Sequence, residues 1–225
     1  MKTRLDAELV RRELARSREQ AADLIEKRSV LVNGIPATKP ATQVDAETSI
    51  TISGDRDDFV SRGGHKLEGA LIAFTGVNVE GKRCLDAGAS TGGFTDVLLQ
   101  NGAVHVTGVD VGQGQLHAKL QQDPRVRCIE KHNARTLSMD LFAAEPLFDL
   151  AVADASFISL TLLIPAIVHV LTPSGLLLLL VKPQFELQPE DIGKGGLVKE
   201  PAKYQDVETR LRDCCAQNGV EVLQW

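Results

Sequence analysis

The regular alternation of apolar and amphipathic segments after Arg62 constrains the fold of this chain more than any other feature. Short apolar segments typical of buried strands occur at residues 83–88, 104–110, 126–131, 149–154 and 176–182. Segments with helical spacing occur at residues 65–74, 93–102, 159–171 and 202–219. This alternation predicts an α/β fold, with an open, mostly parallel sheet covered by helices on both faces. Such sheets bind ligands at the carboxyl ends of their strands.

The first 54 residues have a different pattern, which predicts a small α+β unit. Helical spacing of apolar residues indicates a helix over residues 5–14, and Ser17 with Gln20 is typical of a capping box that begins a second helix. Residues 30–37 alternate around an Asn-Gly turn, and another strand is expected at residues 49–53. We therefore divide the chain into a small domain at 1–54, a polar linker at 55–65 and a larger domain at 66–225.

Composition narrows the class of protein. The 225 residues are 43% hydrophobic and 24% charged, which is ordinary for a globular protein. The net charge of −5 does not indicate a nucleic-acid binder, although residues 1–54 hold nine Lys or Arg against eight Asp or Glu. Four cysteines without a C-x-x-C pair, and no secretory signal, predict reduced thiols in a cytoplasmic protein and no zinc site. The longest apolar run, residues 175–181, falls far short of the roughly 20 residues of a membrane helix.

A glycine-rich turn, "CLDAGASTGGFTDVLL" at residues 84–99, joins the first strand of the larger domain to a helix. Its glycines permit close approach of a ligand to the backbone, and the helix N-terminus presents unpaired N–H groups. A dinucleotide site would have G-x-G-x-x-G, but Ser90 stands where the second glycine belongs, which argues against a nicotinamide cofactor. A tight strand-to-helix turn without a ligand is the alternative.

Three charged residues stand at or near this edge of the predicted sheet. Asp154 ends an apolar strand in "VADASF", where a carboxylate is costly unless it is solvated, paired or used. Lys182 follows five leucines and a valine, and burial there would favour its neutral form, which is a base. Lys66 lies in "SRGGHKLEGAL". Taken singly, they are also explained as a helix cap, a strand-end charge and a surface lysine, but their occurrence together makes a shared role harder to dismiss.

The whole chain resembles the TlyA family, whose members are described as hemolysin-like or as ribosomal RNA 2′-O-methyltransferases. Its larger domain is similar to FtsJ-type RNA ribose methyltransferases through "VSRGGHKL", "LDAGASTGGFTDVLL", "VDVGQGQL", "VADASFISL" and "LVKPQFE". Its first domain resembles the RNA-binding domain of ribosomal protein S-four through "RLDAELVRRELARSREQAADLI", "VLVNG" and "TKPAT". The resemblance implies a Rossmann-like S-adenosylmethionine-dependent methyltransferase sheet preceded by a small α+β RNA-binding domain. It further implies a cytidine of ribosomal RNA as substrate, ribosomal RNA or ribosomal subunits as partners, and no metal.

The resemblance also implies roles for individual residues. Lys182 would take the proton from the ribose 2′-hydroxyl, Asp154 would orient that lysine, and Lys66 would help position the target. Asp110 would accept the ribose hydroxyls of the cofactor, and Asn133 would flank its adenine unless it only forms a turn. The residues implied for cofactor binding are Asp86, Gly88, Ser90, Gly92, Gly93, Phe94, Asp110 and Asn133.

The sequence departs from the family at two places. FtsJ-type enzymes use a Lys-Asp-Lys-Glu tetrad, but no residue here matches its glutamate, which the family places after a strand within which this sequence stops, at Trp225. We therefore expect either a truncated sequence or impaired catalysis, and a non-catalytic RNA-binding protein on a methyltransferase scaffold is the alternative. Arg28 stands where related RNA-binding modules commonly end a helix with glycine, a difference of about 1 kcal/mol in local fit.

Basic residues of the first domain are expected to face RNA phosphates. A solvated helix surface that also carries Glu8 and Glu19 would explain them without RNA, and the family resemblance favours the RNA interpretation. The expected RNA-binding residues are Arg4, Arg11, Arg18, Lys27, Arg28 and Arg62. A membrane-lysing protein, as the hemolysin name suggests, is a third hypothesis, and no spanning or strongly amphipathic segment supports it.

Overall fold

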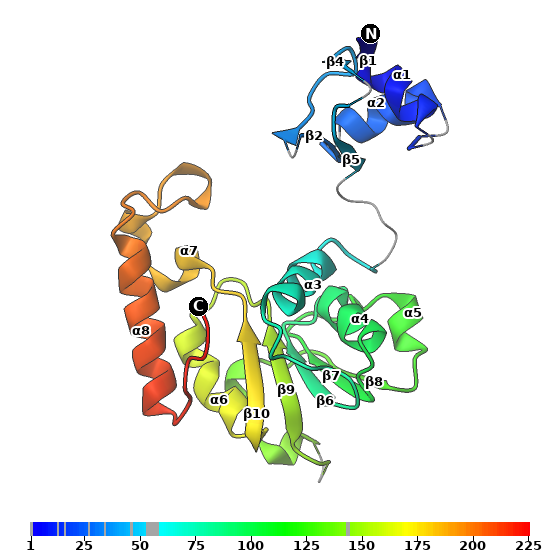
Figure 1. Ribbon diagram of the computed structural model, residues 1–225. Coiled ribbons are helices and arrows are strands. Elements are labelled where there is room, and N and C mark those ends of the chain that lie inside the picture. Colours follow the sequence, from blue (N-terminus) through cyan, green and yellow to red (C-terminus); the bar gives the residue numbers. More distant parts are fainter. Residues whose placement is uncertain are drawn as a thin grey trace. The chain divides into compact units, whose positions relative to one another are not determined.

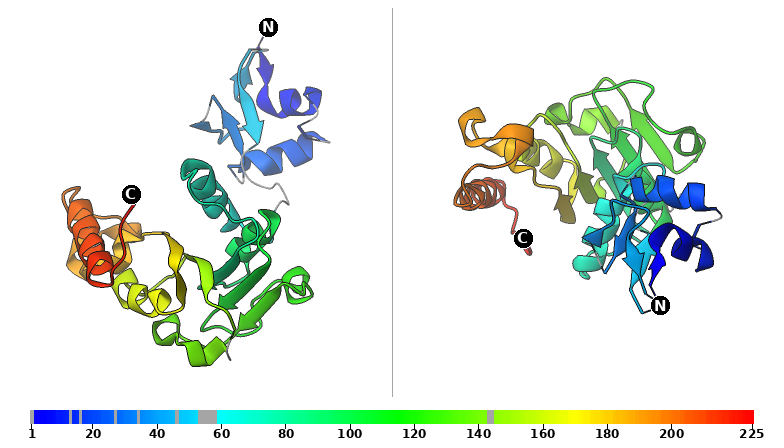
Figure 2. Two further views of the ribbon diagram at one scale, coloured as in Figure 1. Left: turned by 60° about the horizontal axis from the view of Figure 1, so that its bottom comes forward. Right: turned by 90° about the horizontal axis from the view of Figure 1, so that it is seen from above.

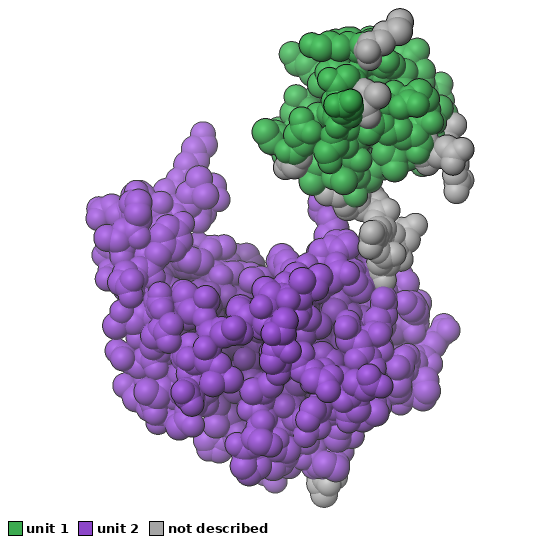
Figure 3. Space-filling model, viewed as in Figure 1, with its two compact units in different colours: residues 1–58 green, residues 59–225 purple. Residues whose placement is uncertain are grey.

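The computed structural model describes residues 2–12, 14, 15, 17–26, 28–33, 35–45, 47–52, 59–142 and 145–225. The chain divides into two compact units, Met1–Asp58 and Phe59–Trp225 (Figure 3). The linker that we expected at residues 55–65 therefore overlaps the second unit. Residues 59–65 belong to that unit because they pack on it, and Val60 N–H, for example, donates to Asp96 Oδ2 at 2.8 Å. Each unit is therefore a separate domain with its own fold.

The first unit is the small α+β fold that the sequence predicts. Its elements are β1 (Thr3–Arg4), α1 (Leu5–Arg11), α2 (Arg18–Glu26), β2 (Val30–Val32), β3 (Ile35–Pro36), β4 (Gln43–Val44) and β5 (Ile50–Ile52). Strands β3, β2 and β5 form one antiparallel sheet, and β1 pairs with β4. Asn33 has a φ of 51°, the left-handed conformation expected in the turn between β2 and β3, and Gly34 lies outside the described residues. Leu5, Leu9 and Ile25 are fully buried between the helices and strands.

The second unit contains the predicted parallel sheet. Its strands are β6 (Arg83–Ala87), β7 (His105–Val109), β8 (Val126–Ile129), β9 (Phe148–Ala153) and β10 (Leu171–Leu179). They lie in the order β10-β9-β6-β7-β8, and every neighbouring pair is parallel. The strand order reverses between β6 and β9, and open α/β sheets bind ligands at this kind of switch point.

Helices cover both faces of the sheet, as Figures 1 and 2 show. On one face, α3 (Gly64–Ala73) and α4 (Gly93–Gln100) lie over a core that includes Leu150 and Val152 of β9. On the other face, α6 (Ile164–Val168) and α8 (Lys203–Gln217) lie over a core that includes Ala151 and Ala153 of the same strand. Side chains of a strand alternate between faces, so a strand that is apolar at every position is buried on both.

The segment between β9 and β10 differs from our prediction of one helix over residues 159–171. The structure has a 3₁₀ turn, η3 (Leu160–Leu162), followed by the short helix α6. Pro165 is the second residue of α6, and since proline has no N–H and clashes with the preceding turn, it favours the start of a new helix over the continuation of one from residue 159. Strand β10 begins at Leu171 rather than at residue 176, with a shift of register before Leu176. Residues 220–225, where we expected a final strand, form neither helix nor strand.

Candidate active site

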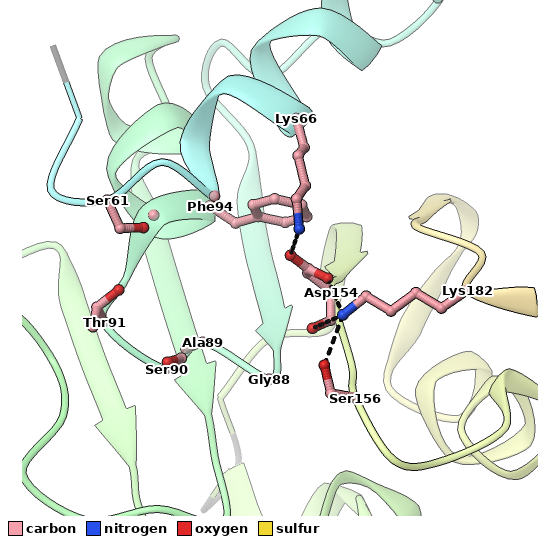
Figure 4. A pocket seen from close by; sticks show the side chains of 12 residues that line it. Ser61, Lys66, Gly88, Ala89, Ser90, Thr91, Phe94, Asp154, Ser156 and Lys182 are labelled. Carbon is pink, nitrogen blue, oxygen red and sulfur yellow. Dashed lines mark hydrogen bonds and ion pairs between the residues drawn. The ribbon is translucent and has the colours of Figure 1, made fainter. Parts of the chain in front are cut away.

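A cavity of about 290 Å³ opens at the carboxyl ends of β6, β9 and β10 (Figure 4). Its walls come from the segment before α3, from α3 itself, from the glycine-rich turn and from the loops after β9 and β10. The lining residues are Ser61, Gly63, Lys66, Gly88, Ala89, Ser90, Thr91, Gly93, Phe94, Asp154, Ser156 and Lys182. The structure thus brings together the three charged residues singled out from the sequence and four of the eight residues that we expected to bind the cofactor.

Two lysines meet one aspartate in this cavity. Lys182 Nζ lies 2.5 Å from Asp154 Oδ1, and Lys66 Nζ lies 2.9 Å from Asp154 Oδ2, so each amine contacts its own carboxylate oxygen. Lys182 Nζ also donates to Ser156 Oγ at 2.7 Å. In Figure 4 the two lysines approach Asp154 from different elements, Lys66 from α3 and Lys182 from the loop after β10. The predicted convergence of these residues is therefore present.

The two lysines differ in their exposure to solvent. The side chain of Lys182 is 18% exposed, whereas that of Lys66 is 49% exposed. Burial alone would raise the pKa of Asp154, but the contacts with the amines of Lys182 and Lys66 outweigh burial and hold its pKa below the usual value. Asp154 is thus an anion at neutral pH that orients a more buried and a more exposed amine.

Close packing of α3 on α4 places Lys66. A Cβ atom on Gly93, the first residue of α4, would lie 2.3 Å from Ser61 Oγ and 2.9 Å from the backbone nitrogen of Gly64. Only glycine allows this approach. The buried carboxylate of Asp96 in α4 accepts Val60 N–H at 2.8 Å and so fixes the same segment. Gly93, expected from the sequence to serve the cofactor, therefore also seats the helix that carries Lys66.

Two carboxylates lie next to the turn after β6, that of Asp110 directly after β7 and that of Asp86 in β6. Asp110, after β7, accepts Ser90 N–H at 2.9 Å and Gly112 N–H at 2.7 Å, one on each oxygen. Each carboxylate oxygen has two acceptor positions, so one on each remains for a ribose hydroxyl. Ser90 has a φ of 48°, a conformation that is rare for residues with a side chain and is found at functional turns.

Asp86 lies beneath this turn, in β6, with 1% of its surface exposed. Its Oδ2 accepts the hydroxyl of the fully buried Thr95 at 2.7 Å, and its Oδ1 has no hydrogen-bond partner among the described residues. Burial raises the pKa of Asp86 to about 7, although hydrogen bonds from Thr95 act in the opposite direction. Asp86 therefore supports the turn from below, and it is not part of the cavity wall.

The site fits the cofactor that the resemblance implies. Gly88, Ser90, Gly93 and Phe94 line the cavity, where backbone N–H groups at the start of α4 suit an anionic group such as the carboxylate of methionine. Asp110 retains acceptor positions for hydroxyls. Asp86, Gly92, Asp110 and Asn133 lie outside the cavity wall. The Asn133 side chain accepts Arg135 N–H at 3.1 Å, which is the turn-forming role that we weighed against an adenine contact.

Comparison with known proteins agrees with this geometry. A model of FtsJ-like methyltransferases matches residues 59–225, and a model of the S4 domain matches residues 3–50. The chain belongs to the FtsJ-like methyltransferase family. The cavity at the carboxyl edge of the sheet thus lies in the methyltransferase domain.

Three relatives of this FtsJ-like methyltransferase illustrate the match. It is 52% identical over 201 residues to "16S/23S rRNA (cytidine-2′-O)-methyltransferase TlyA" of Mycobacterium tuberculosis, covering 89% of this chain and 74% of the relative. It is 42% identical to "Hemolysin A" of Brachyspira hyodysenteriae over 82% of this chain and 75% of that one. A solved structure, described as a hemolysin from Streptococcus thermophilus, is 41% identical, with a TM-score of 0.74 over 99% of this chain and 81% of that chain.

In the S4 domain of this FtsJ-like methyltransferase, exposed arginines form ion pairs with buried acidic residues. Asp6 accepts Arg4 Nη2 at 2.9 Å and Arg18 Nη2 at 2.8 Å, while Glu8 accepts Arg11 Nη2 at 2.6 Å. The side chains of Arg4, Arg11 and Arg18 stay 47%, 62% and 60% exposed. The hydrogen bond from Arg4 chiefly lowers the pKa of Asp6. These guanidinium groups are therefore fixed in place and still face solvent.

The other expected RNA-binding residues are placed differently. Arg28 is exposed and has a φ of 57°. This is the left-handed conformation expected where related domains have glycine, so the prediction of a glycine-like helix end at Arg28 is confirmed. Arg62, in the methyltransferase domain, is exposed between Ser61 and Gly63 of the cavity wall. Lys27 lies outside the described residues.

Several residues near the site were not identified from the sequence. Ser156 contacts Lys182, and Glu186, four residues after Lys182, is only 3% exposed. Phe157 has a φ of 63° and is 90% exposed, with its ring 5.1 Å from that of Phe185. The "FE" that ends "LVKPQFE" was the available signal for Phe185 and Glu186, but nothing in the sequence shows which of these side chains is buried.

Two negative findings concern only the described part of the chain. No helix there is long and apolar enough to cross a membrane. Within the same residues, no group of three or more His, Cys, Asp or Glu side chains is placed to hold a metal ion.

Proposed function

We propose that this FtsJ-like methyltransferase transfers a methyl group from S-adenosylmethionine to the ribose 2′-hydroxyl of a cytidine in ribosomal RNA. The observation that carries the proposal is the single carboxylate of Asp154, held between the amines of Lys66 and Lys182 beside the glycine-rich turn. The name of the 52% identical relative from Mycobacterium tuberculosis supports the choice of substrate.

The residues of the site divide the chemistry among them. When bound, S-adenosylmethionine supplies an electrophilic methyl group attached to a sulfonium, and because the sulfur leaves as a neutral thioether, the leaving group needs no metal. A ribose hydroxyl is a poor nucleophile, so its oxygen must lose a proton as it gains the methyl group. Lys182 is the better placed of the two amines to take this proton, because contacts with Asp154 and Ser156 fix its position. Lys66, half exposed at the cavity mouth, contacts the opposite oxygen of Asp154 and helps position the target.

The S4 domain supports RNA as the substrate. Its fixed, exposed guanidinium groups on Arg4, Arg11 and Arg18 suit phosphates, which position an RNA without selecting a base. We expect the partner to be ribosomal RNA or a ribosomal subunit, and the protein to act in the cytoplasm. We also expect the turn after β6, with Asp110, to hold the cofactor.

A non-catalytic RNA-binding protein is the second candidate function. The observation in its favour is the S4 domain, whose exposed guanidinium groups can bind RNA without any methyl transfer. It predicts binding of the cofactor and of RNA without turnover.

Transfer of a labelled methyl group from S-adenosylmethionine to purified ribosomal subunits tests the proposal. We expect transfer by the wild-type protein, a loss of about 10²- to 10⁴-fold in rate for Lys182→Met, which removes a general base, and no change for Lys82→Met. Lys82 precedes β6 at the opposite end of the sheet and is a matched control. Cofactor binding without any transfer by the wild type would favour the second candidate, and lysis of membranes by the purified protein would instead support a hemolysin.

A further inference from the structure

Two loops that leave neighbouring strands carry the acid and the base of the site. The last backbone hydrogen bond joining β9 to the end of β10 runs from Leu180 N–H to Ala153 O at 2.9 Å. Asp154 and Lys182 lie beyond this point, where the described residues show no further strand pairing. The 2.5 Å contact between Lys182 Nζ and Asp154 Oδ1 therefore depends on what holds the two loops together.

Glu186 joins these two loops. It is the last residue of α7 (Pro183–Glu186), four positions after Lys182, and only 3% of its surface is exposed. Its Oε2 accepts the hydroxyl of Ser159 at 2.5 Å, and its Oε1 accepts Leu160 N–H at 2.8 Å. Both donors belong to the loop that begins at Asp154. Hydrogen bonds as short as that of Ser159 are typical of charge-assisted pairs, which are about twice as strong as neutral ones.

No counter-ion explains the burial of this carboxylate. Within the described parts of the chain, no cation forms an ion pair with the Glu186 side chain, and Arg210 of α8 donates to its backbone oxygen instead. A buried carboxylate is costly unless hydrogen bonds satisfy it, and its donors among the described residues, Ser159 and Leu160, both follow Asp154 in the loop after β9. Ser159 is itself fixed, because its hydroxyl caps η3 by accepting Thr161 N–H at 3.1 Å.

We propose that Glu186 is a positioning residue, whose carboxylate ties the loop of Asp154 to the loop of Lys182 and so holds the base against the acid. This inference rests on the proposed function, since it gives Glu186 a role in the same reaction. Glu186 acts only through Asp154 and Lys182. Its link closes a short ring, because Ser159 lies only five positions after Asp154 and Glu186 only four positions after Lys182, so neither loop can move far without breaking it.

Steady-state kinetics of four single variants and one double variant test the proposal. We expect Glu186→Ala to lower kcat at least 10-fold with unchanged KM for cofactor and ribosomal subunits, because a displacement of about 1 Å at a reacting group can cost 10²-fold in rate. Glu186→Gln should retain most activity, since its amide can accept Leu160 N–H and donate to Ser159. Ser159→Ala should lower kcat in the wild type but add little to Glu186→Ala, as expected for two partners of one hydrogen bond. Glu190→Gln, an exposed carboxylate nearby, is the matched control.

Labelling of Lys182 by an amine-reactive ester, quantified by peptide mass spectrometry, tests the geometry without the reaction. We expect labelling at least 3-fold faster in Glu186→Ala than in the wild type, with Lys82 as internal reference. If Glu186→Ala does not fold, the same comparison is made with Ser159→Ala. Unchanged kcat and unchanged labelling of Lys182 would overturn the proposal. A wild type that transfers no methyl group would instead refute the proposed function, and the labelling would still decide whether Glu186 holds the loops together.

Discussion

Replacing Asp86 by asparagine should remove a pH dependence from the stability of the methyltransferase domain. Asp86 is 1% exposed, and burial raises its pKa from 3.8 to about 7. Because its pKa is raised in the folded state, the folded protein binds this proton more tightly than the unfolded chain does. The stabilisation is therefore fully present below about pH 4 and is lost as the pH rises through about 7.

The size of the effect follows from the shift of the pKa. A shift of about three units corresponds to about 4 kcal/mol at 1.36 kcal/mol per unit, and roughly a third of it is already lost at pH 5. The wild type should therefore lose about 3 kcal/mol between pH 5 and pH 8 relative to Asp86→Asn. With a urea m-value of about 1–3 kcal/mol per molar, this difference is a shift of about 1–3 M in midpoint.

Urea unfolding at pH 5 and pH 8 measures this difference in stability. The fluorescence of the single tryptophan, Trp225, reports on the methyltransferase domain, to which it belongs. Taking the difference between wild type and variant cancels other titrating groups, such as His105, whose pKa burial lowers. Asp140→Asn, at an exposed aspartate, is the control and should follow the wild type. An equal difference between wild type and Asp86→Asn at pH 5 and at pH 8 would refute the reasoning.

Three further predictions concern the packing of α3, the S4 domain helix and RNA binding. Gly93→Ala should destabilise the methyltransferase domain by about 1–3 kcal/mol because its Cβ would lie 2.3 Å from Ser61 Oγ, whereas Gly69→Ala, with no atom within 4 Å, should stabilise α3 by about 0.5–1 kcal/mol in the same denaturation assay. Arg28→Gly should stabilise the S4 domain by up to about 1 kcal/mol, since its φ of 57° suits glycine, and a lower thermal midpoint would contradict this. Arg11→Gln should weaken binding to ribosomal RNA and reduce the slope of log affinity against log salt by about 1, and an unchanged slope would exclude a phosphate contact.

The architecture and the meeting of Asp154 with Lys182 were predictable from the sequence because they depend on local patterns. Segments that are apolar at every position predict strands buried on both faces, and parallel strands align their carboxyl ends. Asp154 and Lys182 therefore had to meet at one edge of the sheet once their strands were recognised. The left-handed conformation of Arg28 was predictable only through the resemblance, because related RNA-binding modules commonly have glycine at this helix end.

The features that were missed depend on contacts between distant segments. The break of the expected helix at residues 159–171 had a local signal in Pro165 that we did not use. The burial of Glu186 had none, because its partner Ser159 lies 27 residues away in the chain. The additional role of Gly93 is likewise invisible in sequence, since it depends on the approach of Ser61 from another element.

Mass analysis of nucleosides from ribosomal RNA that has been incubated with the protein and S-adenosylmethionine tests the central claim most directly. A methyl group on the sugar shifts the mass of the ribose fragment, and a methyl group on the base shifts the mass of the base fragment. The account predicts the added methyl group on the ribose of a cytidine, and its loss in Lys182→Met. A methyl group found on a base, or equal ribose methylation by Lys182→Met, would contradict it.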